Sequence, residues 1–106
     1  MTQRCKAYDC KAEIGAKFLM CEKHWLSVSM ETRRAVVTAF IPGQQITGKI
    51  SIDYVKAANR ARYEVAVYEN FSAHNLRRIR KAQKWTEQFW VQQEVEKLKK
   101  DFQYKA

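Results

Sequence analysis

Four side chains of the types that bind zinc lie within the first 24 residues of this chain. They follow the pattern C-x4-C-x10-C-x2-H and include every cysteine in the sequence: Cys5, Cys10, Cys21 and His24. Structural zinc sites hold the ion in a tetrahedron of four such ligands. Residues 1–25 carry few long apolar side chains before Phe18, so burial alone cannot stabilise this segment. The spacing therefore predicts Zn²⁺ bound by these four residues.

The predicted site is closed. Three thiolates and one imidazole fill all four positions, which leaves no place for water or substrate and favours a structural role over a catalytic one. Two alternatives stay open from the residues alone. Asp9 is a weaker candidate for the fourth ligand, which would free His24. Alternatively, the cysteines are small buried apolar side chains and His24 is a hydrogen-bonded polar residue.

The length and cysteine count limit the class of protein. A chain of 106 residues predicts one domain, with a zinc-binding module at 1–28 and a helical region at 29–106 packed with it. Three cysteines cannot all pair within one chain, and the N-terminus lacks the apolar stretch of a secretory signal. No apolar run approaches the ~20 residues of a membrane span. We therefore expect a cytoplasmic protein without a membrane partner, whose thiols bind metal.

The rest of the pattern predicts a mainly α fold with a small N-terminal zinc knuckle and β-hairpin. Three helices are expected at about 29–41, 51–69 and 73–103, the last one long. A serine stands at the start of each, as is typical of N-caps: Ser29, Ser51 and Ser72. Residues 43–50 are expected to form a loop. Gly15 suits the turn of the hairpin, with arms at 11–14 and 17–20.

Residues that recur at helical spacing, most of them apolar, predict which face of each helix packs. In the first helix they are Met30, Arg33, Val36, Val37 and Phe40, and in the second Tyr54, Ala58, Ala61, Val65 and Tyr68. The last helix has two such stripes, first Leu76, Ile79, Thr86, Phe89 and Trp90, then Val91, Val95, Leu98 and Phe102. This change of face predicts that the two halves contact different surfaces, or that the far half pairs with a second copy. Trp25 and Phe18 are expected to pack the zinc module onto the helices.

Positive charge is concentrated in one segment. The formal net charge is +9, and five of the basic side chains lie in residues 77–84 with no acidic residue among them: Arg77, Arg78, Arg80, Lys81 and Lys84. On a helix, such a run gives a basic face suited to phosphates, opposite Leu76 and Ile79. A solvated helix face is the equally weighted alternative. Arg60, Arg62 and the basic residues of the first knuckle extend the patch only if the fold aligns them.

Three aromatic residues follow the basic segment: Trp85, Phe89 and Trp90. Exposed aromatic side chains of this kind often anchor protein interfaces. A contact in the core, or in a homodimer through the C-terminal helix, is the favoured interpretation of this group.

One stretch of the sequence resembles a known family. The strings MCEKHW at 20–25, RRAV at 33–36 and IPGQ at 41–44 are similar to small phage- and prophage-encoded zinc-finger proteins of largely unknown function. The resemblance covers about residues 4–70 and implies a zinc site at the four residues above and a phage context. Phe40 and Ile41 depart from the family's usual Tyr and Arg, and the helix from residue 73 has no counterpart.

These observations favour a small phage-type accessory protein that binds nucleic acid, with DNA favoured over RNA, through the basic helix face. The alternative is a phage-encoded interaction protein or inhibitor that docks on a host protein complex. An enzyme is not expected, because the chain has two histidines and lacks a Gly-rich phosphate loop and a nucleophile elbow.

Overall fold

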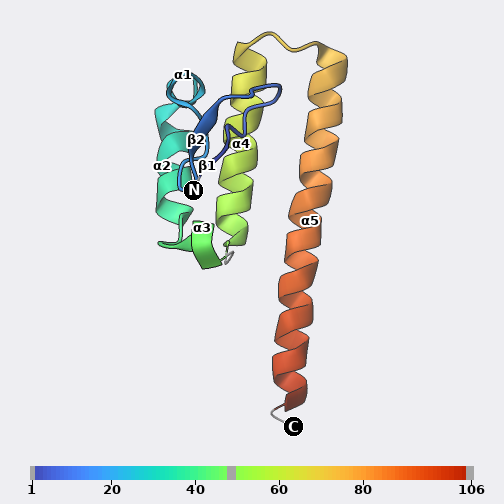
Figure 1. The fold of residues 1–106 in the computed structure, drawn as a ribbon. Helices are drawn as coiled ribbons and strands as arrows, with labels where there is room; N and C mark the ends of the chain where they lie inside the picture. Colours follow the sequence, from blue (N-terminus) through green and yellow to red (C-terminus); the bar gives the residue numbers. More distant parts are fainter. Residues whose placement is uncertain (1, 48–49, 105–106) are drawn as a thin grey trace.

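The computed structural model describes the backbone of residues 2–47 and 50–104, and the side chains of 2–44, 46–47 and 50–89. The fold is mainly helical with a small N-terminal hairpin, as the sequence predicts (Figure 1). Its elements are β1 (Thr2–Arg4), β2 (Glu13–Gly15), α1 (Glu22–Trp25), α2 (Met30–Ala39), α3 (Gln44–Thr47), α4 (Ile52–Tyr68) and α5 (Ala73–Tyr104).

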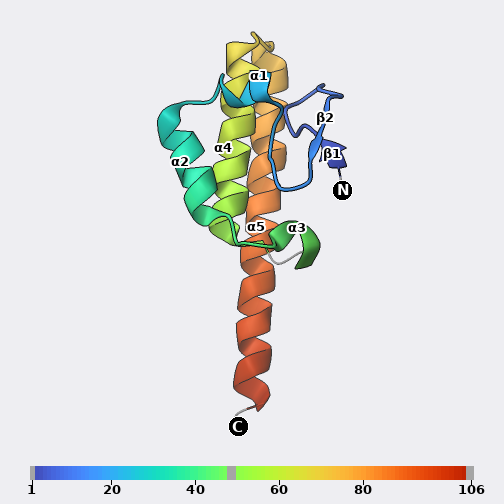
Figure 2. The same ribbon diagram turned by 60° about the vertical axis from the view of Figure 1, so that its left-hand side comes forward.

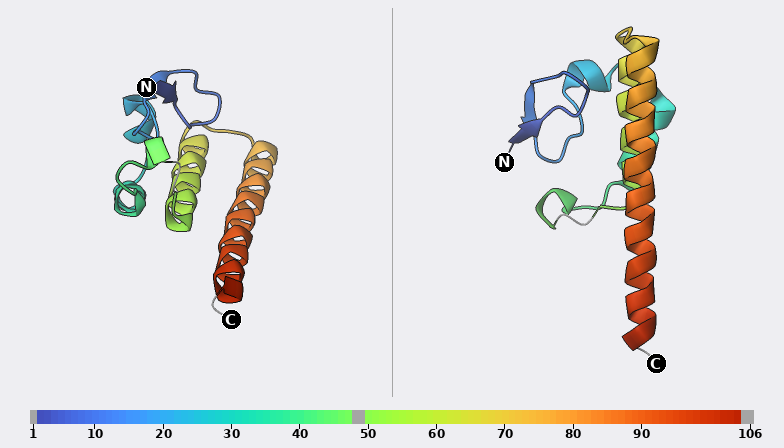
Figure 3. Two further views of the ribbon diagram at one scale, coloured as in Figure 1. Left: turned by 60° about the horizontal axis from the view of Figure 1, so that its bottom comes forward. Right: turned by 90° about the vertical axis from the view of Figure 1, so that its right-hand side faces the viewer.

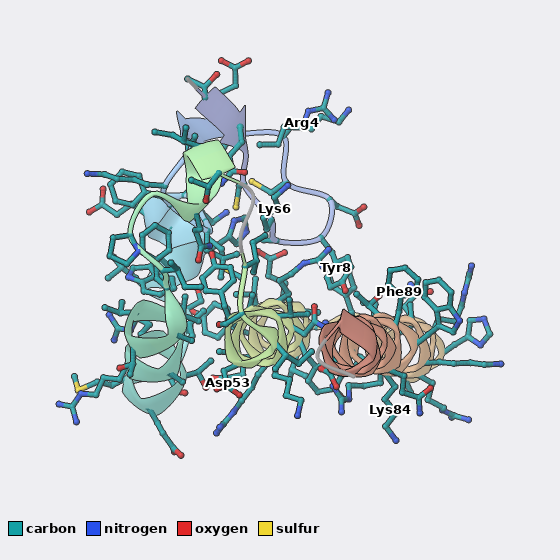
Figure 4. The ribbon with its side chains drawn as sticks, turned by 90° about the horizontal axis from the view of Figure 1, so that it is seen from below. Arg4, Lys6, Tyr8, Asp53, Lys84 and Phe89 are labelled. Atoms are coloured by element: carbon teal, nitrogen blue, oxygen red, sulfur yellow. The ribbon has the colours of Figure 1, made fainter. Side chains whose placement is uncertain are left out.

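The long helices form one layer. Helix α4 lies between α2 and α5, and the three are side by side in Figures 1 and 4. The hairpin and α3 cover one face of this layer, as the turned views of Figures 2 and 3 show. The other face of α4 and α5 is left without a covering element in the described part of the chain. This two-sided arrangement decides where the charged residues point.

The hairpin pairs different strands from those predicted. β1 and β2 run antiparallel, with Gln3 opposite Ile14, whereas the sequence pattern indicated a pairing of 11–14 with 17–20. Residues 17–20 form no strand; the chain turns at 15–18, where the N–H of Phe18 donates to the carbonyl of Gly15 at 3.0 Å. The Gln3 amide further donates to the carbonyls of Ala16 and Phe18. This path brings Cys21 beside Cys5, and the Cys21 N–H donates to the Cys5 sulfur at 3.2 Å.

Helix α2 begins at the predicted cap. The hydroxyl of Ser29 accepts from the N–H of Thr32 at 3.3 Å, and the Ser29 N–H donates to the Glu64 carboxylate at 3.0 Å. A carboxylate at this end of a helix also interacts favourably with the helix dipole. Thr32 donates to the same carboxylate and is fully buried. The helix therefore packs on Val36, which belongs to the predicted stripe, and on Thr32, which does not, whereas Met30 and Val37 of that stripe are exposed.

Helix α4 carries the centre of the core. Its buried side chains are mostly small, which permits close approach of the neighbouring helices: Ala57, Ala58, Ala61, Val65 and Ala66. All of these except Ala66 share one apolar cluster with residues of the N-terminal module, including Cys5 and Met20, and Trp25 packs against the cluster as expected. The prediction for Tyr68 is wrong, because its side chain is 69% exposed. Glu64 is already level with the start of α2, so Tyr68 lies a turn beyond that helix.

The segment between α2 and α4 is less irregular than predicted. Short helix α3 occupies part of the expected loop at 43–50, and the buried Gln44 side chain accepts from the N–H of Ile41 at 2.9 Å. Gly43 permits the turn that leads into α3, because its φ of 81° is in the left-handed region that favours glycine. Residues 48 and 49 of the same loop lie outside the described residues.

Helix α5 begins after a short turn. Asn70 adopts a left-handed φ of 59°, and the Ser72 hydroxyl accepts from the N–H of Asn75 as the predicted cap. At 1.5 Å per residue, α5 is about 48 Å long and α4 about 26 Å, so the far half of α5 extends beyond the rest of the fold (Figures 1 and 2). The side chains of 90–104 lie outside the described ones, so the predictions for Trp90 and for the second apolar stripe stay predictions. Within the described ranges, no helix combines the length and apolar character needed to cross a membrane.

Candidate metal centre and basic groove

The first two candidate ligands come from the loop between β1 and β2. The N–H of Cys5 donates to the carbonyl of Ala12 at 2.8 Å, which closes the base of this loop. At its tip Asp9 has a left-handed φ of 64°, and the N–H of Cys10 donates back to the carbonyl of Ala7 at 3.3 Å. Asp9 thus makes the turn that brings Cys10 back to Cys5, and it is not part of the ligand cluster.

The other two ligands lie at the start of α1. Cys21 is the N-cap residue and His24 follows three positions later, so both side chains point to the same side of the first turn. His24 is buried, with 6% of its surface exposed. The x2 spacing in the sequence corresponds to this helical start.

The structure brings the four predicted residues together. One ligand atom from each of Cys5, Cys10, Cys21 and His24 lies within 4.8 Å of the other three, and no cysteine forms a disulfide. The His24 Nδ1 is 3.1 Å from the Cys21 sulfur and 3.6 Å from the Cys5 sulfur. A tetrahedral zinc ion with bonds of about 2.3 Å to sulfur and about 2.0 Å to nitrogen would separate the nitrogen from each sulfur by about 3.5 Å. The spacing and the donor set therefore fit a metal ion of this kind.

The two thiols nearest His24 have opposite electrostatic environments. Burial raises the pKa of Cys5 to about 11. Burial also acts on Cys21, but hydrogen bonds outweigh it, first the one from the His24 N–H, and lower the pKa of Cys21 to about 7. Thiolates are the metal-binding form, so Cys21 is the better prepared of the two ligands. A bound cation would favour the thiolate at both positions.

Glu69 is a functional residue that the sequence analysis missed. It caps the C-terminus of α4, and its carboxylate accepts a hydrogen bond from the Nε2 of His24. Metal-binding histidines usually donate their second N–H to a carboxylate, which fixes the tautomer and orients the ring. Here that arrangement leaves Nδ1 for the metal. The two residues are 45 positions apart, so no local pattern in the sequence signals the pair.

The loop between β1 and β2 that carries Cys5 and Cys10, here called the metal loop, is also linked to α5 through Tyr8. The Gln83 amide is buried and donates to the Tyr8 hydroxyl at 3.1 Å and to the carbonyl of Asn59 at 2.9 Å. The Arg62 guanidinium lies 4.2 Å from the centre of the Tyr8 ring and donates to the carbonyl of Lys6. The loop that carries Cys5 and Cys10 is therefore fastened to both α4 and α5.

Four of the five predicted basic residues line an open groove between α4 and α5. Its volume is about 490 Å³, and its lining consists of Tyr63 from α4 and of Ala73, Leu76, Arg77, Arg80, Lys81 and Lys84 from α5. No acidic side chain of the described residues is among them. Arg80 is held in place by a 3.1 Å hydrogen bond to Gln83, with its guanidinium 5.6 Å from the centre of the Tyr63 ring. The groove is thus a concave basic surface with one aromatic wall.

The basic residues do not all share one surface. Arg78 is exposed but does not line the groove, whereas Leu76, expected on the opposite side, does. Figure 4 shows Lys84 on the uncovered face of the helical layer and Arg4 and Lys6 beyond the other face. The basic residues of the first knuckle therefore do not extend the groove. Arg60 is three residues before Tyr63 on α4, so the two side chains are neighbours on the helix surface. The Arg60 guanidinium, however, lies within 4 Å of the carboxylates of Glu31 and Glu64, which offset its charge.

The aromatic group after the basic segment is partly described. Trp85 and Phe89 are 68% and 44% exposed, and their rings stack with centroids 5.8 Å apart. Trp85 therefore makes no core contact, and the other half of the favoured prediction, a contact in a homodimer, stays a prediction. The side chain of Trp90 lies outside the described ones.

A second, apolar groove lies between the hairpin and α2. It has a volume of about 580 Å³, and its walls include Phe18, Met20, Trp25, Val37 and Tyr54. Phe18 is 55% exposed, so the expectation that it packs the zinc module onto the helices is wrong in this respect.

No family model, curated protein or solved structure matches this chain. The functional assignment therefore depends on the geometry of the site.

Proposed function

We propose that this chain is a small phage-type accessory protein that binds nucleic acid through the basic groove and that carries a structural zinc ion in its N-terminal module. The basic groove between α4 and α5 is the observation that carries the proposal. Arg77, Lys81 and Lys84 stand exposed along it on a rigid helix, with no acidic residue of the described part lining it. Contacts of this kind bind phosphates without reading sequence.

The metal supports this function indirectly. Three thiolates and one imidazole are a donor set typical of structural zinc, with all four positions filled. The cluster is tied to the end of α4 through His24 and Glu69, and to α5 through Tyr8 and Gln83. Zinc would therefore order residues 2–28 and fix the angle between the two helices that form the groove.

The proposal is tested by measuring the affinity for DNA and RNA at several salt concentrations. The triple variant Arg77→Ala, Lys81→Ala, Lys84→Ala should bind at least tenfold more weakly, and its salt slope should fall by about two to three units. The matched control is Arg4→Ala, Lys11→Ala, Lys17→Ala, which removes the same charge from exposed positions of the N-terminal module. Equal weakening in both variants would show that only net charge matters and would contradict the assignment to the groove.

The apolar groove supports a second candidate function, an interaction protein or inhibitor that docks on a host protein complex. Exposed apolar side chains that line a groove are typical of protein-binding surfaces. If this function holds, a stoichiometric protein partner should be recovered with the wild type and lost with Val37→Asp, whose side chain is 66% exposed in the wild type. Recovery of the same partner by both proteins would remove this candidate.

A further inference from the structure

Trp85 and Phe89 form a solvent-exposed aromatic surface on α5. They are one helical turn apart, and their rings are nearly parallel, with an interplanar angle of 11°. The contact with Phe89 leaves most of the Trp85 surface in water. Such exposure is unusual for large aromatic side chains, because burying them is favourable. A flat, stacked and accessible pair is suited to a further planar ring.

Basic residues connect this pair to the groove. Lys81 is one turn before Trp85 on the same side of α5, and it also lines the groove. Arg78 is two turns before Trp85 and is exposed. Figure 4 shows Phe89 and Lys84 on opposite sides of α5, so the surface runs around the helix from the groove, across Lys81 and Arg78, to the aromatic pair.

We propose that this surface binds single-stranded nucleic acid, with phosphates in the basic groove and along Lys81 and Arg78 and with bases stacked on Trp85 and Phe89. This inference rests on the proposed function and adds the class of nucleic acid. In a duplex the faces of the bases are covered by their neighbours, whereas a single strand can lay its bases on aromatic side chains. A base against Trp85 would continue the stack that Trp85 and Phe89 already form.

The dimensions give the size of the site. The surface runs from Arg77 to Phe89, which are separated by about 18 Å along the helix axis, at 1.5 Å per residue. At the rise of about 3.4 Å per stacked nucleotide, this length accommodates at most about five nucleotides. Stacking on aromatic rings and phosphate contacts are tolerant of sequence, so we expect little preference among bases.

The test compares fluorescence anisotropy titrations of a short labelled oligothymidylate and of a duplex of the same length. Trp85→Ala should weaken binding of the single strand about tenfold, because stacking on one aromatic side chain supports changes of that order, and should leave duplex binding within about twofold of the wild type. Trp85→Phe keeps an aromatic ring and should recover most of the affinity. Tyr68→Ala is the matched control, because Tyr68 is an equally exposed aromatic residue on α4 that does not line the groove.

The outcomes separate this inference from the proposed function. If the groove triple variant loses affinity but Trp85→Ala binds the oligothymidylate like the wild type, the inference is wrong and the proposed function stands. Equal loss of single-strand and duplex affinity in Trp85→Ala would also overturn the inference. If the triple variant binds both nucleic acids like the wild type, the proposed function itself is wrong. Because Trp85 is exposed, its variants should keep the wild-type melting temperature, which is measured in parallel.

Discussion

Replacing Glu69 should weaken metal binding although Glu69 is not a ligand. Its carboxylate accepts from the Nε2 of His24, and the opposite ring nitrogen faces the sulfurs of Cys5 and Cys21. In Glu69→Ala, His24 loses the group that orients its ring and selects its tautomer, while the backbone that ends α4 is kept. Comparable changes in other metal sites reduce affinity by about 10- to 100-fold.

The structure narrows the range of affinity loss expected for Glu69→Ala. The Glu69 side chain is 32% exposed, so water screens part of its charge, whereas the His24 side chain is only 8% exposed. We therefore expect a loss near tenfold, or about 1.4 kcal/mol, for Glu69→Ala. Glu69→Gln keeps an oxygen that can accept the hydrogen bond and should lose less.

The assay is a competition titration of zinc between the protein and a chromophoric chelator. Glu13→Ala is the control, because it removes an exposed carboxylate from β2, away from His24. If Glu69→Ala and Glu13→Ala bind zinc equally well, the hydrogen bond to His24 does not support the metal site and the reasoning is refuted.

Three further predictions concern stability and can be measured by chemical unfolding. Val65→Ala should destabilise the fold by about 2 kcal/mol, because Val65 is buried and only 1% exposed. The control Val67→Ala, at a position of the same helix that is 48% exposed, should change stability by less than about 0.5 kcal/mol. Similar losses of stability in both variants would contradict the assigned core. Burial alone would raise the pKa of Glu64, but hydrogen bonds from Thr32 and Ser29 and the charge of Arg60 lower this pKa below its ordinary 4.5. The stability that the Glu64 carboxylate contributes is therefore complete above pH 4.5 and is lost as the pH falls through the lowered pKa. Glu64→Gln should therefore be less stable than the wild type at pH 7, with the difference shrinking in acid, and a difference independent of pH would be evidence against this role. Tyr8→Phe removes one of the two acceptors of the buried Gln83 amide and should cost about 1 kcal/mol; an unchanged stability would mean that this link does not fasten the metal loop to α5.

The parts of the fold that could be predicted from the sequence are those set by local physics. The Cys21 and His24 pair depends on one helical turn, and the caps at Ser29, Ser51 and Ser72 depend on a hydroxyl three residues from an N–H. The three long helices follow from the spacing of apolar residues and the positions of Pro and Gly. The donor set of the candidate metal centre could also be predicted, because every cysteine of the chain belongs to it.

The parts that could not be predicted depend on contacts between distant residues. The hairpin arms could not be predicted, because the carbonyls of Phe18 and Leu19 accept from the distant Gln3 and Lys6 instead of pairing across the turn at Gly15. The buried face of α2 is set by Thr32 through its bond to Glu64, which an apolar pattern cannot reveal. Tyr63 was missed as a wall of the basic groove because its place there depends on how α5 packs on α4.

The metal content of the folded protein tests the central claim most directly. The proposed roles of the four candidate ligands, of Glu69 and of zinc in ordering residues 2–28 all require an ion at this site. We predict one zinc per folded chain by elemental analysis of the protein purified without chelator, and loss of the folded N-terminal module when a strong chelator removes it. A folded, metal-free chain with the same melting temperature in the presence of chelator would contradict the account.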